Sequence, residues 1–144
     1  MLDKATREEL IQRINALDDN SKPQWGKMNI YQMLKHCTMW DEMVLKNKKY
    51  DRVFLGRIFG RMALKGALKD ASPMTRNAPT IPALKVTDNG DASAQKRQWI
   101  AMIDQYGTFS HPIFMHPFFG KMTQEQIGCF AYKHTDHHLR QFNV

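Results

Sequence analysis

The chain has 144 residues, of which 24% are charged and 42% are aliphatic, aromatic or sulfur-containing, a balance typical of one globular domain with its own core. It has no apolar run long enough to cross a bilayer and no secretory signal at its N-terminus, so we expect a cytoplasmic protein without a membrane span. The formal charge is +7, but the basic residues are scattered and no nucleic-acid motif accompanies them, so we expect no nucleic-acid partner. Cys37 and Cys129 stand at no metal or redox spacing, and we expect two reduced, buried thiols.

Three helices are predicted by capping boxes, in which the N-cap residue and the residue three positions later satisfy each other's free amides. Apolar residues follow each box at helical spacing, over 7–17, from 30 to the basic run at 46–49, and from 124 onward. The boxes are Thr6 with Glu9, Asn29 with Gln32, and Thr123 with Gln126.

Residues 52–69 predict a shorter amphipathic helix, in which cations recur every four residues and large apolar side chains fall mostly on the other side. We favour a surface helix whose apolar side packs on the bundle over a helix that contacts a membrane surface or an acidic partner. The cations are Arg57, Arg61, Lys65 and Lys69.

The remaining segments complete a helical pattern. Residues 70–90 are rich in proline and asparagine and predict an irregular crossover, after which Asp91 or Ser93 caps another helix. No strand-like alternation of useful length and no internal repeat is found. We therefore expect a single all-α domain over 1–144, a bundle of four main helices with long crossover connections and no sheet.

The last helix places histidines where core residues belong. Two buried imidazoles cost free energy unless both are partnered, and one divalent ion would partner both. The i,i+4 spacing of the pair puts both rings on one face of the helix. The predicted inward stripe is Ile127, Ala131, His134, His138 and Gln141.

A third ligand must come from elsewhere in the chain, because catalytic metal sites usually have three protein ligands and one open position. His36 is the best candidate, since it lies on the second helix between Gln32 and Trp40, one turn from each. His111 and His116, in the loop before the last helix, are alternatives as ligands or as groups that support ligands, although the default interpretation of these histidines beside prolines is as turn residues.

Other residues narrow the chemistry. Thr135 stands where a metalloprotease of the HExxH type has its glutamate, which argues against peptide hydrolysis by that mechanism. His137 lies at the edge of the stripe and is interpreted as a solvated or hydrogen-bonding side chain rather than a ligand. The pocket, or the groups behind the ligands, is expected to include Gln32, Trp40, Met43, His116, His137 and Gln141.

Four segments carry a resemblance to a known family: Trp25-Gly26-Lys27-Met28, Met33-Leu34-Lys35-His36-Cys37, His116-Pro117-Phe118-Phe119-Gly120, and Lys133 to Phe142. They resemble the DinB/YfiT-like superfamily, and most closely a branch designated only as domain of unknown function 1569. The resemblance implies a four-helix bundle in which one histidine of the second helix and the HxxxH pair of the last bind a divalent metal, here His36, His134 and His138. It also implies kinship with metal-dependent transferases that use small thiols such as bacillithiol, mycothiol or glutathione.

Three functions stay open on the sequence. The first is a metal-dependent enzyme, an S-transferase before a hydrolase, in which zinc or nickel activates water or a low-molecular-weight thiol for a small-molecule substrate. The second is a non-catalytic, metal-stabilised bundle that acts as a binding or interaction module. The third is a histidine cluster satisfied by hydrogen bonds alone, which ranks below metal binding because three buried rings are hard to satisfy otherwise. A homodimer is kept open as an alternative to a monomer.

Overall fold

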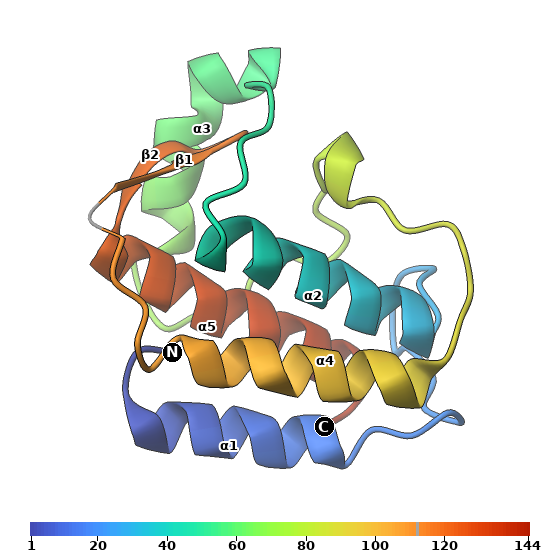
Figure 1. The fold of residues 1–144 in the computed structure, drawn as a ribbon. Helices are drawn as coiled ribbons and strands as arrows, with labels where there is room; N and C mark the ends of the chain where they lie inside the picture. The colour runs from blue at the N-terminus through green and yellow to red at the C-terminus, as the bar shows by residue number, and fades with distance from the viewer. Residues whose placement is uncertain (112) are drawn as a thin grey trace.

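The computed structural model describes residues 1–111 and 113–144, and four of its helices pack together to form the body of the molecule (Figure 1). The helices are α1 (Lys4–Asn15), α2 (Ile30–Leu45), α4 (Ala92–Gln105) and α5 (Gln124–Gln141). α4 packs against α1 and α2, and α5 packs against the same two helices, so the four enclose a common core. Side chains from all four fill this core, among them Leu10, Ile14, Met33, Leu34, Trp99, Ile103, Ile127 and Leu139.

The helix starts follow from their caps, with one correction. The second and third predicted capping boxes are present, at Asn29 and Thr123. α1 begins at Lys4, however, because the Asp3 side chain accepts a hydrogen bond from the backbone N–H of Thr6. Thr6 therefore lies inside the helix, and the first predicted box is wrong: an aspartate serves as N-cap at least as well as a threonine.

A small antiparallel sheet corrects the expectation of an all-α chain. β1 (Ile113–His116) pairs with β2 (Gly120–Thr123), and the molecule is mostly helical with this two-stranded addition. Side chains alternate between exposed and buried along both strands, but β1 begins with three apolar residues, which hides the alternation in the sequence. Gly120 completes the reversal with a φ of +81°, a conformation that glycine adopts without strain.

α3 (Phe54–Ala67) lies beside the hairpin at one end of the helical body (Figure 1). Its inner face is narrow: a Cβ built on Gly60 would lie 2.0 Å from the carbonyl oxygen of Phe118, so the helix rests directly on the backbone of the hairpin turn. The prediction that its apolar side packs on the bundle is wrong, because the large apolar side chains point outward. The exposed residues are Phe54, Leu55, Ile58, Phe59 and Met62.

The predicted irregular crossover connects α3 to α4, with one short 3-10 helix, η1 (Pro82–Leu84). η1 packs against α2, and Leu84 is buried there. This contact places the backbone of a long connection next to the histidine of α2.

The two cysteines differ, and the expectation of two buried thiols is wrong for one of them. Cys37 is buried in α2, and burial raises the pKa of its thiol well above the ordinary value, so it stays protonated. Cys129 is exposed on α5, on the side of the helix away from the inward stripe. Both thiols are free.

Candidate metal centre

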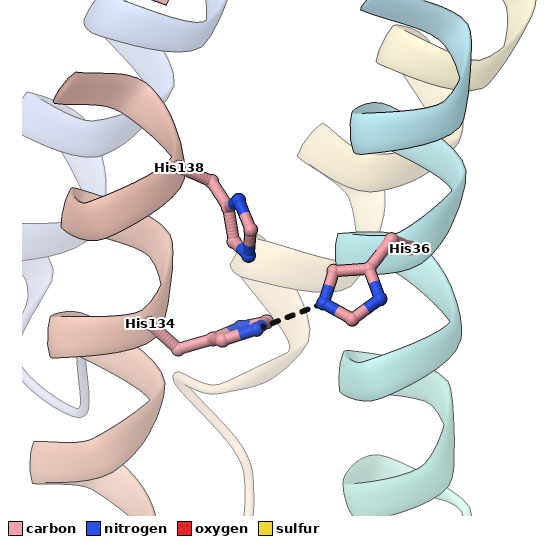
Figure 2. Close-up of side chains that lie close together, drawn as sticks. All are labelled: His36, His134 and His138. Atoms are coloured by element: carbon pink, nitrogen blue, oxygen red, sulfur yellow. Dashed lines mark hydrogen bonds between the residues drawn. The ribbon is translucent and has the colours of Figure 1, made fainter. Parts of the chain in front are cut away.

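Three histidines from two helices converge inside the molecule (Figure 2). His36 projects from α2, and His134 and His138 project from successive turns of α5. Each offers one ring nitrogen to a group in which all nitrogens lie within 4.8 Å of one another, and Nε2 of His36 is 3.2 Å from Nε2 of His134. The fold therefore brings together the three histidines that the sequence predicts as metal ligands.

The geometry of the cluster fits a divalent ion. Two nitrogens bound to one tetrahedral zinc ion at ~2.0–2.1 Å lie roughly 3.3 Å apart, close to the 3.2 Å between His36 and His134. A donor set of imidazoles alone suits zinc, nickel, copper or iron better than magnesium or calcium. The same distance also fits a hydrogen bond between the two rings, in which one of the two nitrogens carries the proton.

Two of the rings are fixed from behind by carbonyl oxygens. Nδ1 of His36 donates to the backbone oxygen of Leu84 at 2.9 Å, and Nδ1 of His138 donates to Oε1 of Gln141 at 2.9 Å. Nε2 of Gln141 in turn donates to the backbone oxygen of Trp25 at 2.8 Å. Because a carbonyl oxygen only accepts, the protons lie on Nδ1, and Nε2 of both rings presents a lone pair to the cluster.

Burial keeps the three rings uncharged. His36, His134 and His138 are 5%, 8% and 6% exposed. Burial lowers the pKa of all three imidazoles, and the neighbouring histidines lower it further for the two on α5, to about 3 for His138. At neutral pH each ring is therefore in the deprotonated form that binds a metal.

An aromatic wall covers one side of the cluster. The centroid of the Trp40 ring lies 5.0 Å from that of the His134 ring. The Phe130 ring is nearly parallel to the His134 ring, and their centroids are 6.2 Å apart. Trp40 and Phe130 also stack on each other at 5.6 Å. Trp40 belongs to the predicted pocket, whereas Phe130 was missed, although its position one turn before His134 is a signal that could have found it.

Two other predicted pocket residues on α2 are engaged elsewhere. The side chain of Gln32 accepts from the backbone N–H of Asn29 in the capping box and donates to the backbone oxygen of Asp88. Met43 is fully buried in the core, seven residues after His36. Gln32 thus stabilises the N-terminus of α2, and Met43 packs α2 against the core.

The histidines outside the cluster have structural partners. Nδ1 of His116, on β1, accepts from the backbone N–H groups of Phe118 and Phe119, and burial, with a smaller effect of Arg52, lowers its pKa to about 3. His111 lies 3.2 Å from the backbone oxygen of Leu45 through its Nε2. Both side chains therefore support the loop and hairpin rather than the group of three nitrogens.

His137 packs behind the cluster rather than in it. Its ring meets the ring of His138 edge-on at 5.1 Å and that of Trp25 at 5.6 Å. Burial lowers its pKa as well. The guanidinium carbon of Arg76 lies over the Trp25 ring, 4.2 Å from its centroid.

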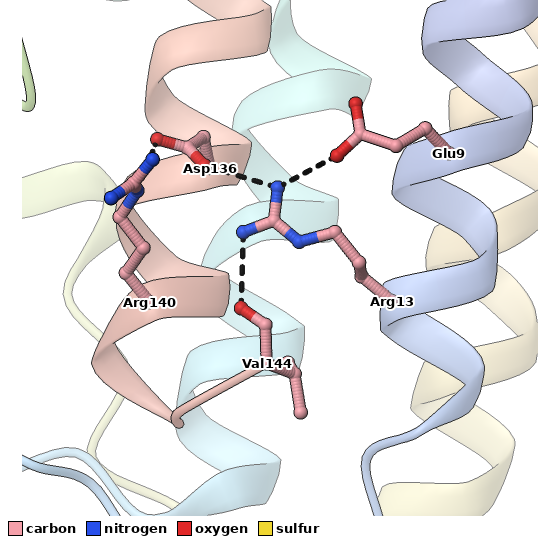
Figure 3. Close-up of polar contacts among 5 residues, drawn as sticks. All are labelled: Glu9, Arg13, Asp136, Arg140 and Val144. Carbon is pink, nitrogen blue, oxygen red and sulfur yellow. Dashed lines mark hydrogen bonds and ion pairs between the residues drawn. The ribbon is translucent and has the colours of Figure 1, made fainter.

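A polar network sets the rotation of α5 (Figure 3). Asp136, which lies between the two clustered histidines in the sequence, accepts from Nη1 of Arg13 at 3.0 Å and from Nε of Arg140 at 2.8 Å. Arg13 also donates to Glu9 at 3.1 Å and to the backbone oxygen of Val144 at 3.0 Å. Because this network holds one face of α5 against α1, the opposite face is directed towards α2. Neither Leu84 nor this network was anticipated, since backbone carbonyls and distant ion pairs have no local sequence signature.

Comparison with known protein families identifies the family to which the chain belongs. The model of a family described as "Protein of unknown function (DUF1569)" matches residues 2–144, a range that includes all the histidines and every element described above. No curated protein and no solved structure matches the chain. The description assigns no activity, so the chemistry must be inferred from the site.

Proposed function

We propose that this chain, which belongs to the DUF1569 family, is a metal-dependent enzyme whose divalent ion is held by His36, His134 and His138. The supporting observation is the convergence of three buried imidazoles that are uncharged at neutral pH. Zinc and nickel are the ions we expect, since both accept imidazole ligands. Three protein ligands leave one position free on a tetrahedral ion, as in catalytic zinc sites.

The chemistry we propose is the transfer of a small thiol to an electrophilic substrate. A divalent ion lowers the pKa of a thiol or water in its open position and so supplies a nucleophile at neutral pH. Leu84 and Gln141 hold two ligands in the tautomer that binds. Trp40 and Phe130 form an apolar wall that suits the carbon skeleton of an organic substrate. No carboxylate belongs to the cluster, which favours a thiol nucleophile over a water that needs a general base, and hydrolysis is the second choice.

The wider resemblance belongs to the same proposal. Membership of the DinB/YfiT-like superfamily, with its four-helix bundle, is supported by the packing of α1, α2, α4 and α5 and by the placement of the histidines on α2 and α5. The alternative is a non-catalytic module with a structural metal closed by a fourth protein ligand. His116 is a candidate for that role, but its Nδ1 accepts from the backbone N–H groups of Phe118 and Phe119. The ring proton therefore lies on Nε2 and neither nitrogen offers a free lone pair, which favours the open site.

Metal content tests the first half of the proposal. Protein washed with chelator and reconstituted with zinc or nickel should hold one ion per chain, and His36→Ala should lose it. His111→Ala is the matched control, because His111 is a partly buried loop histidine outside the cluster and should leave the metal content unchanged. A parent protein that stays metal-free with both ions would contradict metal binding.

Thiol conjugation tests the second half. With glutathione or cysteine as the thiol and an activated aryl halide as the electrophile, a carbon–sulfur bond forms, the halide leaves, and the thiol proton passes to the buffer. We expect conjugation with the metal-loaded protein and none after chelation. Metal-dependent ester hydrolysis without conjugation would favour the hydrolase. Stoichiometric metal without either activity would favour the non-catalytic module.

A further inference from the structure

α3 turns its bulky side outward. Phe54 and Met62 are 73% and 68% exposed, and the intervening Leu55, Ile58 and Phe59 are exposed with them. Their spacing places all five on one face of the helix, which we call the α3 surface. A contiguous exposed apolar face of this kind marks an interaction site in a folded protein.

The orientation of α3 is fixed by contacts that leave no room for the large side chains to turn inward. Gly56 and Gly60 lie against the backbone of Phe118, where a Cβ would come within 2.5 Å and 2.0 Å of its carbonyl oxygen. Nε of Arg52 donates to the backbone oxygen of Pro117 at 3.0 Å, and Nη1 of Arg61 donates to that of Lys121 at 2.7 Å. The apolar face is therefore exposed because the helix docks through its small residues.

The charge around the α3 surface limits what can cover it. Arg57, Arg61 and Lys65 are exposed in a row beside the apolar residues. No acidic residue lies between positions 52 and 69 of the sequence, and none lies between 113 and 123. A second copy of the same surface would bring like charges together, which opposes self-association through it.

We propose that the α3 surface docks on an anionic bilayer. A helix with Phe and Leu on one face and Lys and Arg beside them lies in the bilayer interface, with its apolar side chains among the acyl chains and its cations at the lipid phosphates. In the part of the chain that the structure describes, no helix is long and apolar enough to cross a membrane, so the contact would be peripheral. Ile113 and Met115 are also exposed, on β1, and the Sδ atom of Met115 lies 3.5 Å from Nη1 of Arg52, just before α3.

Vesicle flotation tests this proposal with the full chain. We expect binding to vesicles that contain phosphatidylglycerol and no binding to vesicles of phosphatidylcholine alone, with binding that weakens as salt is added. The double variant Phe54→Ser, Met62→Ser should lower the affinity by ~10-fold or more, since two large apolar side chains no longer enter the lipid. Both residues are exposed, so the metal content and the helical circular dichroism should be unchanged.

Two matched charge variants distinguish the effect on vesicle binding of cations beside the α3 surface from the effect of net charge. Arg57→Gln with Lys65→Gln should weaken binding roughly 5-fold for each cation removed. Lys22→Gln with Arg97→Gln removes the same charge from exposed positions elsewhere and should weaken it much less. Equal losses for the two pairs, or no binding to anionic vesicles, would overturn the proposal. So would a wild-type dimer in sedimentation velocity that the double serine variant converts to a monomer, because the surface would then bind a second copy.

Discussion

α5 and α3 are both amphipathic, and they depart from an ordinary amphipathic helix in opposite directions. α5 turns polar rings into the core, where His134 and His138 are almost fully buried. α3 turns glycines inward and leaves Phe54 and Met62 in solvent. On α5 the polar groups face partners from another helix, whereas on α3 the inner face gains a close backbone contact that large side chains would prevent.

The difference shows that helical period and helix orientation are separate questions. A 3.6-residue period reveals that a helix has distinct faces, but the contact that each face makes decides which one is buried. Buried histidines need partners, and close backbone approach needs glycine. Substitutions on the inner faces of these two helices and of α2 test this distinction.

His134→Ala should abolish high-affinity metal binding, whereas His137→Ala on the same helix should largely preserve it. His134 belongs to the group of three nitrogens and His137 does not. Residues that hydrogen-bond to metal ligands are worth roughly 10–100-fold in affinity, so the loss of a ligand itself should exceed roughly 100-fold. The measurement is a zinc titration of chelator-washed variants at one pH. Retention of metal by His134→Ala and its loss from His137→Ala would reverse the assignment of the helix faces.

Asp41→Asn should make the free energy of unfolding less sensitive to pH. Asp41 is buried on α2 and accepts hydrogen bonds from Nε1 of Trp99 and the hydroxyl of Tyr106, both at 2.8 Å. Burial raises its pKa from 3.8 to about 7. Between those pH values the folded chain holds more protons at this site than the unfolded chain, so the free energy of unfolding falls as pH rises. The stability that the protonated carboxyl contributes is therefore lost by neutral pH. An asparagine keeps both contacts by accepting from Trp99 and donating to Tyr106, and it does not ionise.

The expected gain of Asp41→Asn over the parent is ~2–3 kcal/mol larger at about pH 8 than at about pH 5. Urea unfolding of the two chelator-treated proteins across this range measures it, and the histidines contribute equally to both chains and cancel. Parallel pH profiles for parent and variant would show that the buried carboxyl does not titrate in this window.

Gly60→Ala should destabilise the docking of α3 by ~2 kcal/mol, because its methyl group would overlap the backbone of Phe118. Gly66→Ala is the matched control, since a Cβ at Gly66 meets nothing within 4 Å and alanine favours the helix by ~0.5–1 kcal/mol. Hydrogen exchange of the α3 amides and thermal unfolding report the two effects. Similar behaviour of the two variants would mean that the inner face of α3 is not in close contact.

Gln141→Leu should weaken zinc binding by roughly 10-fold, since it removes the acceptor that fixes the His138 tautomer. Gln141→Glu keeps an acceptor for His138 but loses the donor to Trp25. The zinc affinity of the glutamate variant should therefore lie closer to that of the parent. If both variants weaken binding equally, the contact with Trp25 matters more than the tautomer.

The sequence predicts most helices and the residues of the cluster because both depend on local spacing. The boxes at Asn29 and Thr123 and the stripe through His134 and His138 are of this kind. It fails where a contact between distant segments decides. Leu84 contributes a backbone atom to the support of His36, and the orientation of α3 depends on its approach to Phe118. These features are set by tertiary packing, which no residue pattern encodes by itself.

The separation of the clustered histidines along the chain has a consequence for refolding. His134 and His138 lie one turn apart and come together as soon as α5 forms, an event of roughly a microsecond for an isolated helix. His36 is 98 residues away from His134, so it joins them only after a long loop has closed. A zinc ion added during refolding would therefore meet two ligands before it meets three. Tight metal uptake would then report the final stage of assembly, whereas helix content rises earlier.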